Sequence, residues 1–485
     1  MSRSTTLAAT PLSRLLGCRA PLILAGMGGV ARSELVAAVS GYGGFGFLGM
    51  VREPLALLER EVARVRALTD APFGVNLIPA GTPRALLRSQ VDACIALGVP
   101  AVELFWDVDE GVVARLRAAG ITVLYQVGSA RDALHAQAAG AHAVIAQGVE
   151  AGGHVWGRQP LEALLDEVLG CVSVPVAAAG GLADGRSVGR VLARGAQAVV
   201  LGTALIATDE SFAHDVHKRI LVAGKADATL LTEDFHVNWP PHAAVRVLPN
   251  AVTRGERGDP YTSAPQVIGE EEGRPVYLFS TDSPLRSMTG DLEAMALYAG
   301  RGVDAIDAIE PAARRLARIE REAAAHLRLV ADAPEPLASP VCYAGQAREA
   351  ERAPLIAQLV ALLADERALA RVLAETRAQV LDAPLRTFAD VALAAQTRGC
   401  GTLVRALRAL DAAPDPATGE PYAQAMALRD LRERLALAAR WRGAWQARWQ
   451  ALEAALDDAQ ARDDWQQAVR AHEAVLQEWR WAGPV

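Results

Sequence analysis

One segment of the chain combines residues suited to proton transfer beside a flat ligand. The apolar run Ala143–Gln147 is of strand type, and Gly148-Val149-Glu150-Ala151-Gly152-Gly153-His154 follows it directly. The adjacent glycines Gly152 and Gly153 carry no side chain that would block a ligand. The imidazole of His154 is well suited to moving a proton near neutral pH. The segment therefore predicts a flavin site with one proton-transfer residue, and so a redox enzyme, although His154 could also be a solvent-facing loop residue.

Glycines follow two later apolar runs in the same way. Gly180 and Gly181 come after the run 174–179, and Gly202 and Thr203 come after the run 198–201. Glycines at such positions expose backbone N–H groups, which together with a following helix N-terminus suit a phosphate dianion. We therefore expect a phosphate site here, the alternative being that the glycines serve only tight turns.

Small residues and neutral amides lie at the ends of strand-like runs. They are predicted to surround one uncharged ring, because an amide can donate to ring carbonyls or ring nitrogens. The small residues are Ala25, Gly26 and Met27, and the amides are Asn76, Gln126 and Gln147. The acidic residues near strand ends, Glu103, Asp107 and Glu150, lie without histidine-rich spacing, so no metal site is expected.

The elements that must position these residues repeat along the first 224 residues. A short apolar run, a glycine-containing or polar turn and an amphipathic helical stretch alternate, which favours a parallel sheet with helical crossovers. The predicted strands are 21–25, 44–48, 73–77, 101–105, 122–126, 143–147, 174–179 and 198–201, and the predicted helices include 53–68, 84–97, 109–119, 130–139, 161–169 and 185–193. Eight units predict a (β/α)8 TIM barrel, an α/β fold whose active site lies at the carboxyl ends of the strands. A doubly wound open sheet is the competing fold.

The remainder of the chain divides into two further parts. Residues 225–289, rich in proline, glycine and acidic residues, predict an irregular lid or a disordered excursion. Helices are predicted at Gly290–Arg301 and Ile309–Leu329, so that residues 225–330 complete the catalytic domain. Prolines at 331–346 predict a boundary. Residues 346–485 then predict a separate all-α domain rich in tryptophan.

Trp441, Trp445 and Trp449 recur every four residues, which places them on one face of a helix. Such a face most simply forms the core of a helical bundle. The alternative is an interface with a protein partner or a second copy of the chain, because tryptophan is enriched at interfaces.

Composition excludes several other classes of protein. The net charge of −7 gives no reason to expect a nucleic-acid partner. The five cysteines lack metal-ligand spacing and indicate reduced thiols. Neither a signal peptide nor a membrane span is expected, so we predict a cytoplasmic protein without a membrane partner.

Six segments, in order along residues 15 to about 330, resemble the nitronate monooxygenase family, formerly the 2-nitropropane dioxygenases. They are Gln147–His154, Pro21–Val30, Phe73–Leu77, Ala178–Gly181, Leu201–Thr203 and Ala296–Gly300. The resemblance implies a TIM barrel that binds FMN non-covalently. The phosphate would lie on Gly180, Gly181, Gly202 and Thr203, and the ring edge near Gly26, Met27, Asn76, Gln126 and Gln147. It also implies that His154 is a catalytic base or acid in the oxidation of an alkyl nitronate by O2 to a carbonyl compound and nitrite.

Two other functions remain open at this point. Flavin-dependent enoyl-ACP reductases, which use NAD(P)H, carry a similar Glu-Ala-Gly-Gly-His segment on the same fold. A non-catalytic FMN-binding interaction protein is the other possibility, suggested by the tryptophan-faced domain. The C-terminal helical domain belongs to no version of the nitronate monooxygenase family known to us.

Overall fold

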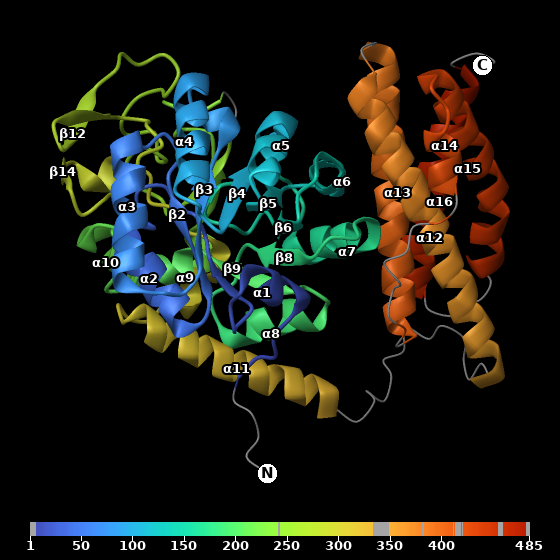
Figure 1. Ribbon diagram of the computed structural model, residues 1–485, viewed down its shortest axis with the longest axis horizontal. Helices are drawn as coiled ribbons and strands as arrows, with labels where there is room; N and C mark the ends of the chain where they lie inside the picture. The colour runs from blue at the N-terminus through green and yellow to red at the C-terminus, as the bar shows by residue number, and fades with distance from the viewer. Residues whose placement is uncertain are drawn as a thin grey trace. The chain divides into compact units, whose positions relative to one another are not determined.

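The computed structural model describes residues 6–240, 243–332, 349–380, 383–410, 412, 419, 421–453 and 459–481 (Figure 1). The chain forms two compact units. The first comprises residues 1–128, 139–162 and 174–331, and the second comprises residues 129–138, 163–173 and 332–485. The boundary predicted at 331–346 falls almost wholly outside the described residues.

Eight parallel strands close into a barrel, which confirms the predicted TIM-barrel fold. The order is β1-β2-β3-β4-β5-β6-β8-β9, and β1 pairs with β9 to complete the ring. The strands are β1 (Leu22–Leu24), β2 (Phe45–Gly49), β3 (Phe73–Leu77), β4 (Ala101–Phe105), β5 (Thr122–Val127), β6 (Ala143–Gln147), β8 (Val176–Ala179) and β9 (Ala198–Leu201).

Alternation along the strands divides the barrel interior into an apolar layer and a polar layer. Inward-facing residues such as Ile23, Phe47 and Leu124 form a buried cluster, which Leu12 and Leu16 of the N-terminal helix α1 (Pro11–Leu16) close from below. Successive side chains on a strand point to opposite faces. On each strand, the inward-facing position two residues nearer the carboxyl end therefore belongs to the polar layer. This layer lies beneath the predicted site.

Helices connect successive strands of the barrel. They are α2 (Ser33–Tyr42), α3 (Leu55–Leu68), α4 (Arg84–Ala96), α5 (Glu110–Ala118), α6 (Ala130–Ala139), α7 (Leu161–Cys171) and α8 (Gly185–Ala193), followed by the short α9 (Thr203–Ile206) and α10 (Asp215–Ala223). The six helices predicted within the repeats are found within two residues of their expected ends.

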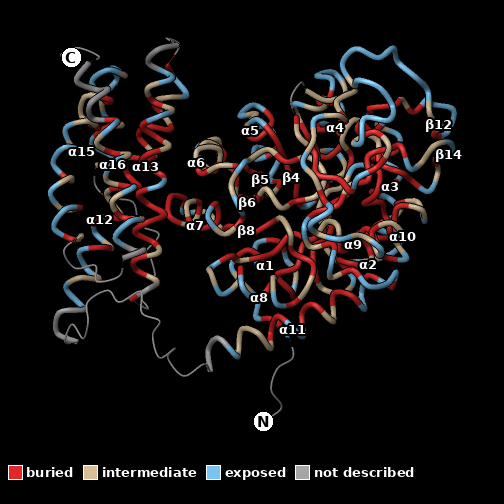
Figure 2. The backbone as a smooth tube through the Cα atoms, turned by 180° about the vertical axis from the view of Figure 1, so that it is seen from behind, coloured by how far each residue is buried: buried red, intermediate tan, exposed pale blue. Residues whose placement is uncertain are grey.

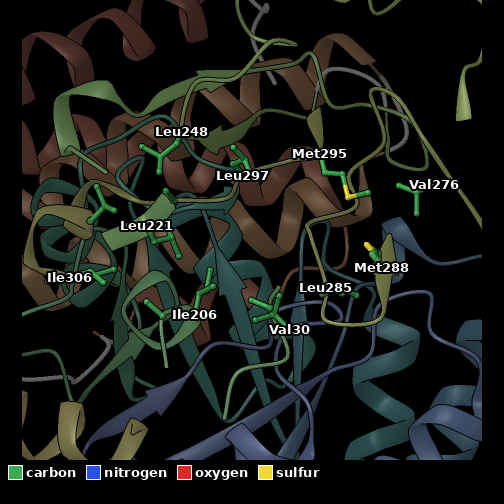
Figure 3. Close-up of a cluster of buried hydrophobic side chains, with 14 residues drawn as sticks. Val30, Ile206, Leu221, Leu248, Val276, Leu285, Met288, Met295, Leu297 and Ile306 are labelled. Carbon is green, nitrogen blue, oxygen red and sulfur yellow. The ribbon is translucent and has the colours of Figure 1, made fainter. Parts of the chain in front are cut away.

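The stretch predicted as an irregular lid is instead built around two small antiparallel sheets. One joins β10 (Leu230–Thr232) and β11 (Val245–Val247) to β7 (Gly153–His154), and the other joins β12 (Val267–Glu271), β13 (Arg274–Tyr277) and β14 (Met288–Gly290). A buried apolar cluster fixes this insert to the barrel loops. Val30 and Ile206 pack there with Leu285, Met288 and Leu297 (Figure 3).

The helix predicted at Gly290–Arg301 is wrong. Residues 292–294 form a single 3₁₀ turn, and the chain then runs extended, with a bridge between Tyr298 and Val247 of β11. Met295, Ala296, Leu297 and Ala299 are all buried. A segment covered on every side has no polar face, so its apolar content does not require a helix.

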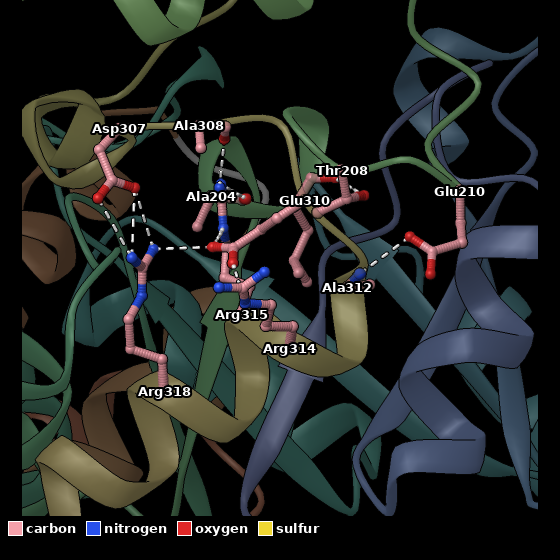
Figure 4. Close-up of polar contacts among 11 residues, drawn as sticks. Ala204, Thr208, Glu210, Asp307, Ala308, Glu310, Ala312, Arg314, Arg315 and Arg318 are labelled. Atoms are coloured by element: carbon pink, nitrogen blue, oxygen red, sulfur yellow. Dashed lines mark hydrogen bonds and ion pairs between the residues drawn. The ribbon is translucent and has the colours of Figure 1, made fainter.

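The helix α11 (Ala312–Asp332), predicted at Ile309–Leu329, is anchored through a buried arginine (Figure 4). Arg315 is 1% exposed and donates to the carbonyl of Ala204 in α9 at 2.6 Å. It also donates to Ala308 O and pairs with Glu310. These contacts hold α9, which begins at the predicted phosphate site, against the start of α11.

The second unit contains a ring of four long helices, which fits the predicted all-α domain. The helices are α12 (Glu349–Gln379), α13 (Ala383–Ala409), α15 (Leu431–Glu453) and α16 (Ala459–Trp481), with the short α14 (Pro421–Met426) between them. Each long helix contacts two others, in the order α12–α13–α16–α15. Buried positions recur along these helices (Figure 2).

Trp445 and Trp449 are buried on α15, whereas Trp441 is only half-buried. The predicted tryptophan face therefore contributes mainly to the core of the bundle. No helix within the described residues is long and apolar enough to cross a membrane.

Candidate active site

A cavity of about 430 Å³ opens at the carboxyl ends of the barrel strands. Its volume falls within the range of small-molecule and cofactor sites. The structure brings together all of the residues that the sequence placed at the site. They are Ala25, Gly26, Met27, Asn76, Gln126, Gln147, Gly152, Gly153, His154, Gly180, Gly181, Gly202 and Thr203.

His154 is positioned by a strand that the sequence did not predict. Gly153 and His154 form β7, and His154 lies opposite Val245 of the insert strand β11. Gln147 supports the same segment, because its Nε2 donates to His154 O at 2.8 Å and its Oε1 accepts from Trp156 N at 3.3 Å. The Gln147 amide thus stabilises the loop that carries His154.

Aromatic side chains from separate parts of the chain surround the His154 imidazole. The Trp239 ring stacks on it with centroids 3.6 Å apart and an interplanar angle of 24°. Trp106 presents its edge at 6.1 Å, and the Tyr298 ring lies at 5.9 Å. Trp156 packs in turn on Trp106 at 4.5 Å. The imidazole therefore has a largely apolar surrounding.

This surrounding keeps His154 neutral. Burial, together with the smaller effect of the positive charge of Arg52, lowers the pKa of His154 to about 3. Among the described residues, no hydrogen-bond partner reaches the buried Nε2 atom. A neutral imidazole with an unused nitrogen can accept a proton from a ligand.

Backbone strain is concentrated around the same imidazole. Arg52, Trp106 and Asn238 have positive φ angles of 58°, 80° and 72°, which non-glycine residues rarely adopt. Arg52 donates to Thr281 Oγ1 at 3.1 Å and lies over the Trp239 ring at 5.8 Å. Strain of this kind persists where surrounding contacts over-determine the backbone, often at functional sites.

The glycines that the sequence placed beside a ligand are also required by the local backbone. A Cβ on Gly152 would lie 2.5 Å from the Gly300 nitrogen, so a glycine at this position leaves room for the neighbouring chain. Gly153, Gly180 and Gly181 have φ angles of 74°, 118° and 68°. These left-handed conformations favour glycine.

The sequence missed the contribution of the insert and of two residues of the barrel. The insert strands β12 to β14 and the loop before β14 cover the cavity. Arg52 follows β2, and Glu103 belongs to β4. The missed lining residues include Arg52, Glu103, Trp239, Glu271, Arg274 and Ser283. Arg52 carried a usable signal, since it follows the carboxyl end of β2, whereas Glu103 lies in the middle of β4 and was considered only as a possible metal ligand. No cluster of three or more metal-ligating side chains is present in the described ranges.

A second buried histidine lies behind the cavity wall. His217 Nε2 contacts Tyr298 O at 3.1 Å, and its Nδ1 contacts Ser283 Oγ at 3.3 Å. A carbonyl can only accept, so Nε2 carries the proton and the Ser283 hydroxyl donates to Nδ1. Burial lowers the pKa of His217 to about 4.

His217 should make the protein sensitive to acid. Below the ordinary pKa of about 6.5, the unfolded chain binds a proton that the folded chain excludes. Stability therefore falls from pH 6.5 towards the folded pKa, by about 1.4 kcal/mol per pH unit from this group. Thermal unfolding between pH 7.5 and 5 should show a steeper decline for the wild type than for His217→Gln. Parallel declines would contradict the assignment.

Comparison with known proteins identifies the family. Residues 9–321 match the family model for nitronate monooxygenase, and residues 353–478 match a domain of unknown function, DUF6306. A curated relative from Staphylococcus saprophyticus named probable nitronate monooxygenase is 31% identical, covering 46% of this chain and 75% of its own. A second, from Mycobacterium tuberculosis, is 35% identical over 54% of this chain and 73% of its own. It is named (3aS,4S,5R,7aS)-5-hydroxy-7a-methyl-1-oxo-octahydro-1H-indene-4-carboxyl-CoA dehydrogenase.

Solved structures agree with the family model. Nitroalkane oxidase from Streptomyces ansochromogenes is 33% identical with a TM-score of 0.56, covering 66% of this chain and 100% of its own. FabK from Thermotoga maritima is 28% identical with a TM-score of 0.57, covering 68% and 100%. Because the family model spans well over half of the chain, this flavin-dependent oxidoreductase belongs to the nitronate monooxygenase family.

Proposed function

We propose that the chain is an FMN-dependent enzyme that oxidises an alkyl nitronate or nitroalkane with O2 to a carbonyl compound and nitrite. The observation that carries the proposal is the neutral His154 imidazole, whose buried Nε2 has no partner in the described part of the chain, at the wall of the cavity. The named nitronate monooxygenase and nitroalkane oxidase relatives support the same reaction class.

The residues of the cavity fit FMN. Asn76 Oδ1 and Glu103 Oε2 are buried polar atoms that no described residue hydrogen-bonds, and a flat polar ring could satisfy them. A Cβ on Gly26 would lie 2.0 Å from Asn76 Cβ, so only glycine leaves room at this wall. Gly180, Gly181, Gly202 and Thr203 would hold the phosphate. When bound, FMN supplies the acceptor for the substrate's electrons and passes them to O2.

The chain's own contribution is the movement of a proton in a largely apolar site. For a neutral nitroalkane, His154 Nε2 would abstract the proton from the carbon next to nitrogen. The Arg52 guanidinium disfavours the imidazolium, but it favours the nitronate anion formed in the same step. The indoles of Trp106 and Trp239 exclude water around the imidazole, which strengthens both interactions.

A second candidate is a flavin-dependent reductase or dehydrogenase acting on an acyl thioester. The relative named as a carboxyl-CoA dehydrogenase, at 35% identity, favours it. The enoyl-ACP reductase alternative, with NAD(P)H as the reductant, belongs to this class. Both candidates would use the same flavin cavity, so they differ in what reduces the flavin. The non-catalytic alternative is disfavoured because these relatives are named as enzymes.

The candidates are separated by one titration. The purified protein should be yellow or take up FMN, and anaerobic propyl-2-nitronate should bleach the flavin band without any nicotinamide. Rapid bleaching by NAD(P)H, followed by reoxidation with a crotonyl thioester, would support the reductase instead. A colourless protein that takes up no FMN would contradict both.

A further inference from the structure

The insert places an indole directly over the proposed base. The Trp239 ring stacks on the His154 imidazole with centroids 3.6 Å apart and an interplanar angle of 24°. Both residues line the cavity, yet His154 Nε2 is buried. Trp239 therefore covers one face of the imidazole, and the nitrogen that would accept a proton is out of contact with solvent.

Residues that follow two barrel strands form the seat of this indole. A Cβ on Gly81, shortly after β3, would lie 2.9 Å from Trp239 Cζ3, so glycine leaves room for the ring. The Trp106 ring, directly after β4, lies nearly perpendicular to the indole with centroids 5.8 Å apart. Ile78 and Phe105 are buried in the same cluster. The indole therefore occupies a position prepared by the barrel as well as by the insert.

Arg52 ties the insert to the barrel at this point. Its guanidinium donates to Asn238 O, directly before Trp239, and to Thr281 Oγ1 at 3.1 Å. It also lies over the Trp239 ring, 5.8 Å from the centroid. Thr281 N in turn donates to Val237 O at 3.3 Å. One side chain after β2 thus holds the two insert segments that meet beside the indole.

The contact between Arg52 and Asn238 joins two strained backbone positions. Their φ angles are 58° and 72°, in the left-handed region that non-glycine residues rarely adopt. Such conformations persist where surrounding contacts over-determine the backbone. No carboxylate in the described part of the chain pairs with Arg52, whose hydrogen bonds go to the insert instead. The guanidinium is therefore committed to holding the insert in place.

Covering the imidazole keeps water away from it. Burial is the larger cause of the low pKa of His154, and the charge of Arg52 is the smaller one. The only other titratable ring beside the imidazole in the described ranges is that of the buried Tyr298, at 5.9 Å, since Trp106 and Trp239 do not titrate. Water admitted by an open cover would move the pKa of His154 towards its ordinary value of about 6.5.

We propose that Trp239 is a cover over His154 and that Arg52 is the positioning residue that clamps this cover shut. Opening of the segment that carries Trp239 admits substrate to the imidazole, and closing excludes water while the proton moves. The inference rests on the proposed function only for the role of His154 as a base. The cover and its clamp can be measured without any turnover.

Modification of the purified full-length protein by diethyl pyrocarbonate measures how often the cover opens. The reagent acylates an unprotonated imidazole that it can reach, and peptide mass mapping gives the rate at each histidine. In the wild type, His154 should react more slowly than His326 on α11, which is half-buried and lies away from the cavity. Trp239→Ala should raise the rate at His154 at least about tenfold, because the imidazole then stays open.

Two variants test the clamp while they preserve the positive charge. Thr281→Val, which changes little in volume, removes one acceptor of Arg52, and Arg52→Lys replaces the forked donor by a single ammonium group. Each should raise the rate at His154 about fivefold, since opening then breaks fewer hydrogen bonds. Thr289→Val is the matched control, because Thr289 is exposed on β14 and does not line the cavity. Its rate should equal that of the wild type.

The pH dependence of the same reaction shows whether water reaches the imidazole. The wild-type rate at His154 should be flat between pH 7.5 and 5.5, because the pKa of His154 is about 3. In Trp239→Ala the rate should fall over this range, since a solvated imidazole becomes protonated near its ordinary pKa of about 6.5.

Equal rates at His154 and His326 in the wild type, or no increase in Trp239→Ala, would overturn the cover. An increase in Trp239→Ala together with wild-type rates in both Thr281→Val and Arg52→Lys would overturn the clamp. The expected rates in a protein that takes up no FMN would support the cover and clamp and contradict only the proposed function.

Discussion

Replacing His154 with asparagine should slow the turnover of a neutral nitroalkane about a thousandfold. Preformed nitronates should be oxidised at a rate within about threefold of the wild type, since their proton has already been removed. Asparagine is polar and of similar size but cannot act as a base near neutral pH. The measurement is kcat/KM for nitroethane and for ethyl nitronate, with bound FMN quantified by absorbance.

The two-substrate comparison makes the result specific to proton transfer. Loss of FMN or collapse of the Trp239 stack would slow both substrates, whereas loss of the base slows only the nitroalkane. His135→Asn provides a control, because His135 on α6 does not line the cavity. Equal loss on nitroethane and ethyl nitronate would contradict a base role for His154.

The sequence predicted the barrel because its strands are of an unusually recognisable type. Buried parallel strands appear as short continuous apolar runs, and β3, β4, β6 and β9 begin and end at the predicted residues. The strand β7 could not be found in this way. Gly153 and His154 form a strand only by pairing with Arg246 and Val245, about ninety positions further along.

The candidate site was predicted only in part, because some of its residues are brought together only by pairing between distant segments of the chain. Asn76 and Gln126 are the last residues but one of β3 and β5, and Gln147 ends β6, so counting strands placed them on one face of the barrel. Trp106 follows β4 and could have been included by that rule. Trp239 offered no signal, because it reaches His154 only through the folding of an insert that the sequence presented as irregular.

The same distinction between local and non-local signals applies to the helical domain. The spacing of Trp441, Trp445 and Trp449 predicted a shared helix face, yet it did not show which polar group would meet that face. Trp449 Nε1 donates to Glu366 of α12, whose carboxylate also pairs with Arg442 at 2.7 Å. Gln396 of α13 donates to the same carboxylate. One fully buried acidic residue thus links three of the four long helices.

Glu366→Leu should therefore destabilise the helical domain by about 3–5 kcal/mol. The loss arises because Arg442, 4% exposed, would keep a buried charge without its partner. Denaturant unfolding of the full-length protein, followed by tryptophan fluorescence, measures the effect, while retained FMN reports that the barrel is intact. Asp365→Leu is the matched control. Asp365 pairs with Arg448 at 2.6 Å on the exposed side of the same helices, and removing such a pair should cost less than about 1 kcal/mol.

The double variant Glu366→Leu/Arg442→Met distinguishes a lost attraction from an isolated charge. If the cost comes from the unpaired arginine, removing that arginine should restore most of the stability, because buried ion pairs contribute little relative to apolar residues of similar volume. If the double variant is instead as unstable as Glu366→Leu alone, the loss must come from Trp449 and Gln396, which would both lack their acceptor. A cost for Glu366→Leu no larger than that for Asp365→Leu would show that the buried carboxylate does not hold the bundle together.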